Sequence, residues 1–551
     1  MTHLRIHLSD GVLESFAFRD ALGRLVNDGV AGQIFAQNPT LWGPAAEPEA
    51  RMRLGWTDSA PGARALLPQI EALRQAFLAR GIDRFVLCGM GGSSLGPAVI
   101  ARWAGVELTM LDTTDPVAVQ RATASDLTRT AVVVSSKSGS TIETRSHLDT
   151  FEQAFEAAGI APEARIVIVT DPGSPFEQES RDAGRHVFLA DPNVGGRFSV
   201  LTAFGLVPAG LAGADVASLV EAGDAARAEL VPDAPSNPAL RLAAALFAGL
   251  PDRFVLALDE APSARWDLGR WAEQLVAEST GKEGLGILPI ALPSDAPEFS
   301  RVPVAAITAR VAGPGADLGI DPGDSEGSGS GSGSRDITVA GSLGAQFLAW
   351  EVATAALGRL MGIDPFDQPD VESAKVAARA ALAELQGAPA THEGPRTGAV
   401  TVVEQPAGAT VESASDIART LRAMTPAAGY LAIQAYVDPQ GALRAPLERL
   451  RASLATALQV PVSLGYGPSY LHSVGQLHKG GPALGAFLQI TSPGDADLAI
   501  AKSESSFATL IDAQARGDRG VLVQRGRPVL ALELASQDAS VIEQLTAALT
   551  A

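Results

Sequence analysis

Residues 85–97 read FVLCGMGGSSLGP and decide the fold. The apolar run Phe85–Cys88 is typical of a buried strand, and the glycines and serines after it indicate a tight turn that opens a helix. Glycines let the backbone approach a ligand closely, and the amides at a helix N-terminus attract phosphate. Alone, the pattern also fits close packing or a dinucleotide-binding turn, although it lacks the third glycine of G-x-G-x-x-G in register.

Short apolar runs of the same kind recur along the chain. Their spacing leaves room for the crossover helices of a parallel sheet. The first unit has Phe85–Cys88, Glu107–Leu111, Thr130–Ser135, Arg165–Thr170 and His186–Leu189, and the second has Phe254–Leu258, Ile287–Ile290 and Val304–Ile307 before a helix at Gly344–Met361. We therefore predict an α/β protein with two doubly wound parallel sheets and a further α/β domain.

The predicted domains follow from these patterns. Residues 1–80 form an N-terminal helical segment, residues 81–235 and 236–388 the two sheet domains, and residues 399–551 the C-terminal α/β domain. In the last domain we expect strands at Val400–Glu404, Tyr430–Val437, Val460–Gly465, Ala486–Ile490, Gly520–Gln524 and Pro528–Leu534, and helices at Ser413–Met424 and Leu443–Leu458. The run SEGSGSGSGS at Ser325–Ser334, natural or engineered, predicts a flexible surface loop, and the polar stretch from Gly387 to Gly398 predicts a linker.

Composition limits the possible functions. The chain has 551 residues, of which 46% are apolar and 19% charged, as in a packed globular protein. Its formal charge of −20 disfavours nucleic acid and anionic membranes as partners, because its long-range field repels polyanions. The single cysteine, Cys88, excludes an intramolecular disulfide, and without a visible leader we expect a cytoplasmic protein. The apolar runs are too short to cross a bilayer.

A second polar turn is expected at the same sheet edge. Residues 135–144 read SSKSGSTIET and follow the strand at Thr130–Ser135. Hydroxyl and amide donors can surround the oxygens of a phosphate, whereas a helix cap would need only one or two hydroxyls. We therefore predict a phosphate site here. Together, the two turns resemble the phosphosugar-binding (SIS) domain of sugar isomerases.

Three further stretches resemble the signatures of the glucose-6-phosphate isomerase family. They are GGRFSV at Gly195–Val200, QLVAESTGK at Gln274–Lys282 and FDQPDVESAK at Phe366–Lys375, in the order found in the family. The resemblance covers about residues 40–385. Leu41-Trp42 and the stretch Leu471–Pro482 also resemble the isomerase half of bacterial transaldolase–isomerase fusions.

The resemblance implies interconversion of glucose 6-phosphate and fructose 6-phosphate by ring opening and cis-enediol proton transfer. This chemistry needs a carboxylate base, an acid/base group at the ring oxygen, a cation near the enediolate and a phosphate anchor. By resemblance, Glu278 is the base, Arg197 stabilises the enediolate and Lys375 assists ring opening. The expected phosphate and substrate contacts are Gly92, Ser93, Ser136, Lys137, Ser138, Thr141, Gln274 and Gln368, while Glu143 orients a ring-opening group or pairs with Lys375.

The ring-opening histidine is the main departure from the family. The segment that corresponds to its usual position, Leu343–Phe347, contains no histidine. By resemblance to a glycine-rich loop of other bacterial isomerases, His478 is the first candidate and His472 the second. An ordinary histidine pKa of about 6.5 suits proton transfer to a ring oxygen. We expect the C-terminal domain to supply this histidine, either within one chain or across a dimer.

Other interpretations stay open from sequence alone. One is a dual glucose/mannose phosphate isomerase, with Thr280 beside the base as a candidate determinant. A non-catalytic phosphosugar sensor would usually carry a basic DNA-binding helix pair, and a dehydrogenase would need an acidic residue after the first glycine turn. We expect no cofactor and no metal, a hexose phosphate substrate and a homodimer. The fusion proteins also suggest a functional association with transaldolase.

Overall fold

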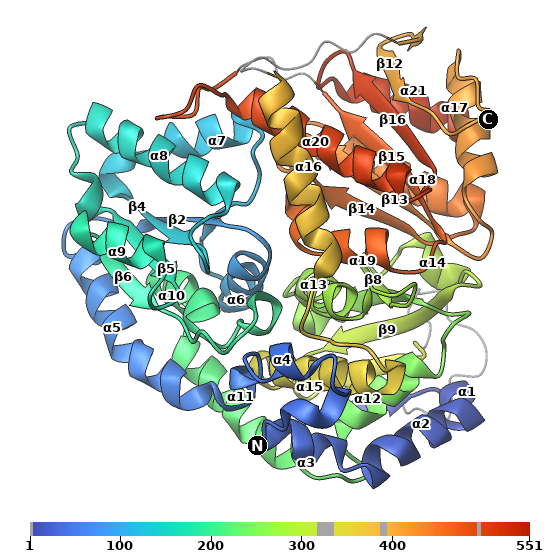
Figure 1. The fold of residues 1–551 in the computed structure, drawn as a ribbon, viewed down its shortest axis with the longest axis horizontal. Helices are drawn as coiled ribbons and strands as arrows, with labels where there is room; N and C mark the ends of the chain where they lie inside the picture. The colour runs from blue at the N-terminus through green and yellow to red at the C-terminus, as the bar shows by residue number, and fades with distance from the viewer. Residues whose placement is uncertain (1–3, 317–334, 386–393, 493–496, 551) are drawn as a thin grey trace.

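Three sheets, each covered by helices, make up the protein (Figure 1). The computed structural model describes residues 4–316, 335–385, 394–492 and 497–550. The prediction of an α/β protein with parallel, doubly wound sheets is confirmed. Two predicted features, the loop at Ser325–Ser334 and the first part of the linker after Gly387, lie outside the described residues.

The first sheet is wholly parallel and bears both polar turns. Its strand order is β3-β2-β4-β5-β6, and Cys88 in β2 lies opposite Val134 in β4. All residues of β4 and β5 are buried, as expected where helices cover both faces of a sheet. The elements are β2 (Arg84–Gly89), β3 (Thr109–Leu111), β4 (Thr130–Ser135), β5 (Ile166–Thr170), β6 (His186–Leu189), α5 (Ala60–Leu78), α6 (Leu95–Ala104), α7 (Pro116–Thr123), α8 (Ile142–Ala157), α9 (Pro175–Asp182) and α10 (Ala203–Ala212).

The second sheet has the order β1-β10-β9-β7-β8. Its strands are β1 (Arg5–Leu8), β7 (Val255–Glu260), β8 (Leu288–Ala291), β9 (Ala306–Ala312) and β10 (Ile337–Ala340). Its helices are α1 (Asp10–Leu13), α2 (Phe16–Asn27), α3 (Val30–Phe35), α4 (Glu47–Ala50), α11 (Val216–Leu230), α12 (Pro238–Phe247), α13 (Leu268–Thr280), α14 (Pro297–Ser300) and α15 (Leu343–Met361).

The prediction that residues 1–80 are helical misses β1. This strand pairs antiparallel with β10, and Arg5 lies opposite Ala340. The two strands are so far apart in sequence that no local pattern reveals their pairing. The N-terminal segment therefore belongs in part to the second sheet.

The third sheet has the order β11-β12-β16-β15-β13-β14. The strands from β16 to β14 are parallel, whereas β11 and β12 are antiparallel at one edge. The elements are β11 (Arg396–Thr397), β12 (Val400–Glu404), β13 (Tyr430–Tyr436), β14 (Val462–Tyr466), β15 (Gly485–Thr491), β16 (Val529–Leu534), α17 (Ala414–Met424), α18 (Arg444–Leu458), α19 (Gly475–Gly480), α20 (Phe507–Gln524) and α21 (Ala539–Thr550).

One predicted strand of the C-terminal domain is wrong. Residues Gly520–Gln524 are the end of helix α20. The buried face of this helix includes Leu510, Gln514 and Val521, which follow helical spacing. The short apolar run near the end of the helix resembles a strand only when it is read apart from the turns before it.

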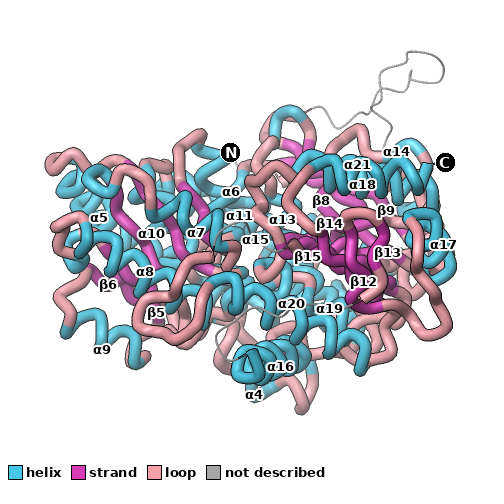
Figure 2. Tube along the Cα trace, turned by 90° about the horizontal axis from the view of Figure 1, so that it is seen from above, coloured by secondary structure: helices cyan, strands magenta, loops and turns pink. Residues whose placement is uncertain are grey.

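The C-terminal domain packs against both other sheets. Tyr430 and Phe487 share an apolar cluster with Phe254 of the second sheet domain, while Phe507 packs with Phe151 of the first. Helix α16 (Pro369–Leu385) runs along α20 where these parts meet (Figure 1). Seen from above, the first sheet lies apart from the other two, and α16 and α20 lie on one side (Figure 2). Apolar burial thus fixes the C-terminal domain in place.

A helix needs about 20 mostly apolar residues to span the hydrocarbon core of a bilayer. No helix within the described ranges is both long enough and apolar enough to cross a membrane.

Candidate active site

A cleft of about 620 Å³ opens where the polar turns of the first sheet meet the second sheet domain and the C-terminal domain. Most of the predicted site residues line it. They are Gly92, Ser93, Ser136, Lys137, Ser138, Thr141, Arg197, Gln274, Glu278, Gln368, Lys375 and His472. Glu143 is not part of the lining, but its carboxylate forms a hydrogen bond with His472, which is. His478 is not part of the lining either.

The second polar turn presents the N-terminus of α8 to the cleft. Thr141 precedes the helix but makes no side-chain capping bond within the described chain, and its hydroxyl lies 3.3 Å from that of Ser136. The first amides of α8 are therefore available to an anion, and the helix dipole favours negative charge there. This geometry supports the phosphate interpretation over simple helix capping.

Lys137 is turned toward the wall of the cleft. Its ammonium group donates to the carbonyl oxygen of Val194 at 3.0 Å and pairs with Asp171 at 2.5 Å. The charge of Lys137 is thus already compensated by a neighbouring carboxylate. The hydroxyls and amides of the two turns are therefore the main candidates for phosphate binding.

The first polar turn is held between two other site segments. A Cβ atom on Gly92 would lie 2.0 Å from the carbonyl oxygen of Gly196, and one on Gly91 would lie 2.5 Å from that of His472. Gly91 also has a φ of +55°, which favours glycine. The turn η3 (Gly91–Ser93) therefore fits between η6 (Gly196–Phe198), which carries Arg197, and η8 (Ser469–His472), which carries His472.

Glu278 lies in the last turn of α13 and lines the cleft. Its Oε2 accepts a hydrogen bond from Nε2 of Gln274, one helical turn earlier, at 3.0 Å. Its Oε1 lies 3.5 Å from Nη1 of Arg197. The same Gln274 amide donates to the carbonyl oxygen of His472 at 2.9 Å. The buried Glu278 carboxylate thus lies between the Arg197 guanidinium and the Gln274 amide, which also bonds to the segment that carries His472.

Arg197 is fixed from several directions. It donates hydrogen bonds to Oγ of Ser279 at 2.8 Å, Oε1 of Gln368 at 2.8 Å and the carbonyl oxygens of Pro365 at 2.6 Å and Asp367 at 3.0 Å. Burial lowers the pKa of Arg197, and the charge of Glu278 opposes this effect. A guanidinium group still stays charged at neutral pH. It therefore provides a preorganised positive charge beside Glu278.

His472 and Glu143 form a hydrogen-bonded pair at the edge of the cleft. Nε2 of His472 lies 3.0 Å from Oε1 of Glu143, which belongs to the first turn of α8. Burial acts to raise the pKa of Glu143, but the charge and hydrogen bond of His472 outweigh it, so this pKa lies below its ordinary value. Glu143 is therefore ionised at neutral pH and accepts the Nε2–H bond of His472.

The position of His478 does not agree with the prediction that this residue opens the sugar ring. It lies in α19, buried beside Tyr430 and Phe487, and its Nδ1 is 2.9 Å from the Tyr430 hydroxyl. Burial, with neighbouring positive charges, lowers its pKa to about 3. It is therefore neutral and enclosed by aromatic rings. The glycine-rich loop instead brings its other histidine, His472, to the cleft.

Two supporting glutamines were missed by sequence reasoning. Gln476 in α19 accepts a hydrogen bond from the amide of Asp370 at 2.9 Å and donates to the carbonyl oxygen of Gly281 at 3.0 Å. It therefore joins the start of α16 to the end of α13. Gln514 in α20 donates to Glu143. A single glutamine on a helix carries no local signal that could have revealed either role.

Thr280 does not face the cleft. Its hydroxyl donates to the carbonyl oxygen of Val276 at 2.7 Å and accepts from the amide of Ile287 at 3.0 Å. The side chain completes the end of α13. The expectation that it discriminates between sugars therefore has no support from its position.

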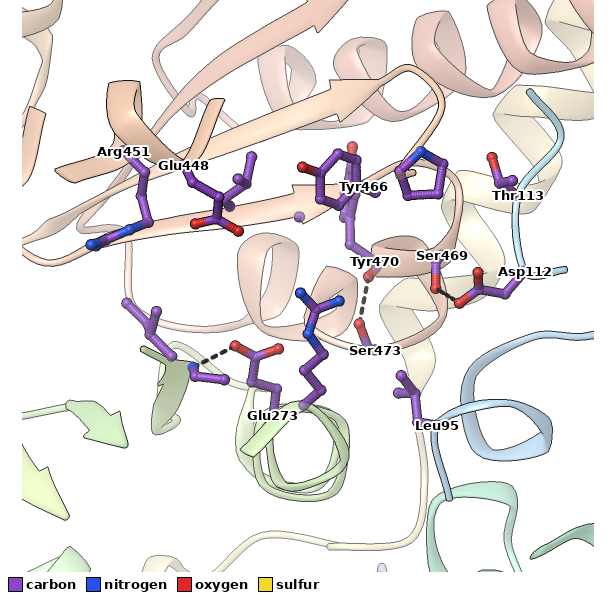
Figure 3. A pocket seen from close by; sticks show the side chains of 16 residues that line it. Leu95, Asp112, Thr113, Glu273, Glu448, Arg451, Tyr466, Ser469, Tyr470 and Ser473 are labelled. Atoms are coloured by element: carbon purple, nitrogen blue, oxygen red, sulfur yellow. Dashed lines mark hydrogen bonds between the residues drawn. The ribbon is translucent and has the colours of Figure 1, made fainter. Parts of the chain in front are cut away.

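A second cavity, of about 120 Å³, lies behind η8 (Ser469–His472) (Figure 3). It is lined by residues of all three domains, including Asp112, Glu273 and Tyr466. Oγ of Ser469 donates to Oδ2 of Asp112 at 2.8 Å, which ties η8 to the first sheet domain. Ser469 and Tyr470 thus line this cavity, while His472 of the same segment lines the cleft.

Known proteins share parts of this sequence and fold. The family model described as "Phosphoglucose isomerase" matches residues 70–283. The chain is 39% identical over 210 residues to glucose-6-phosphate isomerase of Synechococcus sp. strain JA-3-3Ab, an alignment that covers 35% of this chain and 39% of that protein. It is 32% identical over 356 residues to glucose-6-phosphate isomerase of Rubrobacter xylanophilus, with 54% of this chain and 81% of that protein covered.

The chain spans less than half the length of the Synechococcus protein and most of the Rubrobacter protein. Among solved structures, the fold is similar to a glucose-6-phosphate isomerase from Chlamydia trachomatis, with a TM-score of 0.50 and 18% identity. That similarity covers 67% of this chain and 86% of the other.

Proposed function

The chain belongs to the glucose-6-phosphate isomerase family, and from this premise we propose that it interconverts glucose 6-phosphate and fructose 6-phosphate. The observation that carries the proposal is the position of the Glu278 carboxylate. It lies 3.5 Å from the Arg197 guanidinium, in the same cleft as the two hydroxyl-rich turns. One end of the cleft thus suits a phosphate, and the other suits proton transfer at carbon.

Phosphate binding is assigned to the two turns. The hydroxyls of Ser93, Ser136 and Thr141 line the cleft beside the N-terminus of α8. These groups would surround the phosphate oxygens with donors and with the positive end of a helix dipole. A net charge of −20 makes such a local anchor necessary, because the protein as a whole repels anions.

Ring opening is assigned to His472. The ionised Glu143 accepts its Nε2–H bond, which leaves Nδ1, in its protonated form, to donate a proton to the ring oxygen as the C1–O5 bond breaks. The C1 hydroxyl loses its proton in the same step, which forms the aldehyde. Lys375 lines the same cleft and is the candidate for the second group in this step. Because His472 and Glu143 belong to one polypeptide, the proposed site does not need a histidine from a second subunit.

Isomerisation is assigned to Glu278 and Arg197. In the open-chain aldose, Glu278 would remove the proton from C2 and return it to C1. The electron pair left by the C2 proton forms the C1–C2 double bond and pushes the carbonyl electrons onto O1, and this developing negative charge would face the Arg197 guanidinium. O1 then gains a proton and the O2 hydroxyl loses one, so that protonation of C1 leaves the carbonyl at C2. Gln274 and Ser279 fix the two groups, so little rearrangement is needed when charge develops.

The proposal is tested by incubating the protein with fructose 6-phosphate in D2O. We expect glucose 6-phosphate that carries deuterium at C2, detected by proton NMR, because a carboxylate base exchanges its proton with solvent. Mannose 6-phosphate, followed in parallel, tests the dual-specificity alternative. Binding of hexose phosphate without turnover would instead support a phosphosugar sensor and contradict the proposal.

Three predictions from the resemblance belong with this proposal. They are a homodimer, a functional association with transaldolase and a cytoplasmic location. The homodimer can be measured by analytical ultracentrifugation at the concentrations used for kinetics. Specific activity that stays constant while a dimer dissociates on dilution would agree with a site contained in one chain.

Gly92→Ala is expected to lower kcat/KM by about 100-fold or more, because displacing η3 by a fraction of an ångström misaligns the phosphate end and Arg197 together. The added Cβ would lie 2.0 Å from the carbonyl oxygen of Gly196. Steady-state kinetics measure the effect. Gly23→Ala on α2 is the control, since a Cβ there has nothing within 4 Å. Unchanged kinetics in Gly92→Ala would contradict the close packing described above.

A further inference from the structure

Gln514 connects the C-terminal domain to the Glu143–His472 pair. It lies on α20, is 3% exposed and uses both ends of its side-chain amide. Nε2 donates to Oε1 of Glu143 at 2.7 Å, while Oε1 accepts from the hydroxyl of Thr114 at 2.7 Å. Gln514 therefore spans two segments of the first sheet domain from a helix of the third.

The direction of this amide follows from its partners. An ionised Glu143 can only accept, so the NH2 group of Gln514 must face it. The Thr114 hydroxyl then donates to the carbonyl oxygen of the same amide. A flipped amide would place two oxygens against each other at Glu143. The arrangement thus stabilises the ionised form of Glu143, the form that the histidine needs as its partner.

Gln514 and His472 share one oxygen atom. Oε1 of Glu143 accepts from Gln514 at 2.7 Å and from His472 at 3.0 Å. Two donors from different segments of the C-terminal domain therefore fix the rotation of this carboxylate. If the Gln514 donor is lost, only the bond from His472 is left on this oxygen. The carboxylate and the imidazole can then turn together, and the imidazole loses its fixed direction.

The same helix also holds the segment that carries the histidine. Asp518 follows Gln514 by about one turn of α20, and its Oδ2 accepts from the hydroxyl of Tyr470 at 2.6 Å. Tyr470 belongs to η8, two residues before His472. Helix α20 thus fixes both members of the pair, Glu143 through Gln514 and His472 through Tyr470.

We propose that Gln514 is a positioning residue that, through Glu143, directs His472 toward the ring oxygen of the substrate. The inference rests on the proposed function, because it concerns the ring-opening step of that reaction. It assigns to the C-terminal domain a second contribution beyond the histidine itself. It also predicts that a change at Gln514 affects cyclic substrates and leaves the enediol step intact.

Gln514→Leu tests the proposal, because it keeps the shape of the side chain and removes both hydrogen bonds. We expect kcat/KM for glucose 6-phosphate to fall by about 10- to 100-fold and its pH profile to change. The compound 4,5-dideoxyglucose 6-phosphate has no hydroxyl in position to close a ring. For this compound we expect kcat/KM to change by less than about threefold. These ranges follow from the usual contribution of a placed acid/base group.

Gln489→Leu is the matched control. Gln489 is also buried in the C-terminal domain, where it donates to the carbonyl oxygen of Ala515 at 3.1 Å and accepts from Arg519 at 2.8 Å. Both partners lie on α20, so this variant also removes two hydrogen bonds at that helix but neither of the bonds to Glu143 and Thr114. We expect it to leave the ratio between the two substrates unchanged. The proposal is overturned if Gln489→Leu reproduces the altered ratio. It is also overturned if Gln514→Leu lowers kcat/KM for both substrates equally or for neither.

Two further measurements keep the test decisive. If Gln514→Leu fails to fold, Thr114→Val takes its place in the test. This variant removes only the hydroxyl that orients the amide, and we expect it to change the ratio of kcat/KM between the two substrates in the same direction but by less. Nitrogen-15 shifts of the His472 ring report its bond to Glu143 without turnover, and we expect them to move in Gln514→Leu and not in Gln489→Leu. Unmoved shifts overturn the inference. A wild-type protein that converts neither sugar overturns the proposed function instead.

Discussion

Glu278→Gln is expected to abolish proton exchange at C2 of glucose 6-phosphate and to lower kcat by about 10⁴-fold, the upper range for loss of a general base. A glutamine amide has the size of the carboxylate but cannot remove a proton from carbon. Its carbonyl oxygen can still accept from Gln274, which lies 3.0 Å from the carboxylate. The cleft should therefore keep its shape while the chemical step is lost.

Deuterium incorporation from D2O, followed by NMR, measures this loss. Binding of 6-phosphogluconate, an open-chain sugar-acid phosphate, is measured by calorimetry and should stay within about threefold of wild type, since the phosphate anchor is intact. Glu273→Gln is the control on the same helix, because Glu273 lines the cavity behind η8 and not the cleft. Continued exchange in Glu278→Gln would remove Glu278 as the base.

His472→Ala is expected to have the second-largest effect. Turnover of glucose 6-phosphate should fall by about 10²- to 10⁴-fold, because the group assigned to proton transfer at the ring oxygen is removed. Turnover of 4,5-dideoxyglucose 6-phosphate should change little, since it needs no ring opening. Steady-state kinetics on the two compounds measure the difference. Equal losses on both would show that His472 serves another purpose.

His478→Ala provides the contrast. His478 is enclosed by Tyr430 and Phe487, and its pKa of about 3 keeps it uncharged. We expect this variant to lower the free energy of unfolding, because it empties part of an aromatic cluster and leaves the Tyr430 hydroxyl without its partner. The ratio of rates on the two sugars should stay at the wild-type value. Denaturant unfolding and the same kinetic assay measure both effects.

Much of the fold could be predicted because its strands are short buried runs. Strands such as Thr130–Ser135 are apolar throughout, and glycine-rich or hydroxyl-rich turns follow them. The pairing of β1 with β10 could not be predicted, because it depends on contacts between distant parts of the chain. The end of α20 was misread because a short apolar window does not distinguish a strand from a helix face.

The candidate site could be predicted only where residues lie in motifs. Glu278 and Arg197 occur in family signatures, and the structure brings them to one cleft. The choice between His478 and His472 could not be made, since both lie in one glycine-rich loop and spacing does not indicate which side chain is enclosed. Gln514 could not be found at all, because its role arises only when α20 packs beside α8.

The position of His472 late in the polypeptide has a consequence for biosynthesis. The turns at Ser93 and Ser136 and the carboxylate of Glu278 are translated first, and the histidine and helix α20 follow them. A product released before Ser469 would lack His472, the strands β15 and β16 of the third sheet and helix α20. The Glu143–His472 pair therefore forms only after the segments that hold both of its members have been made.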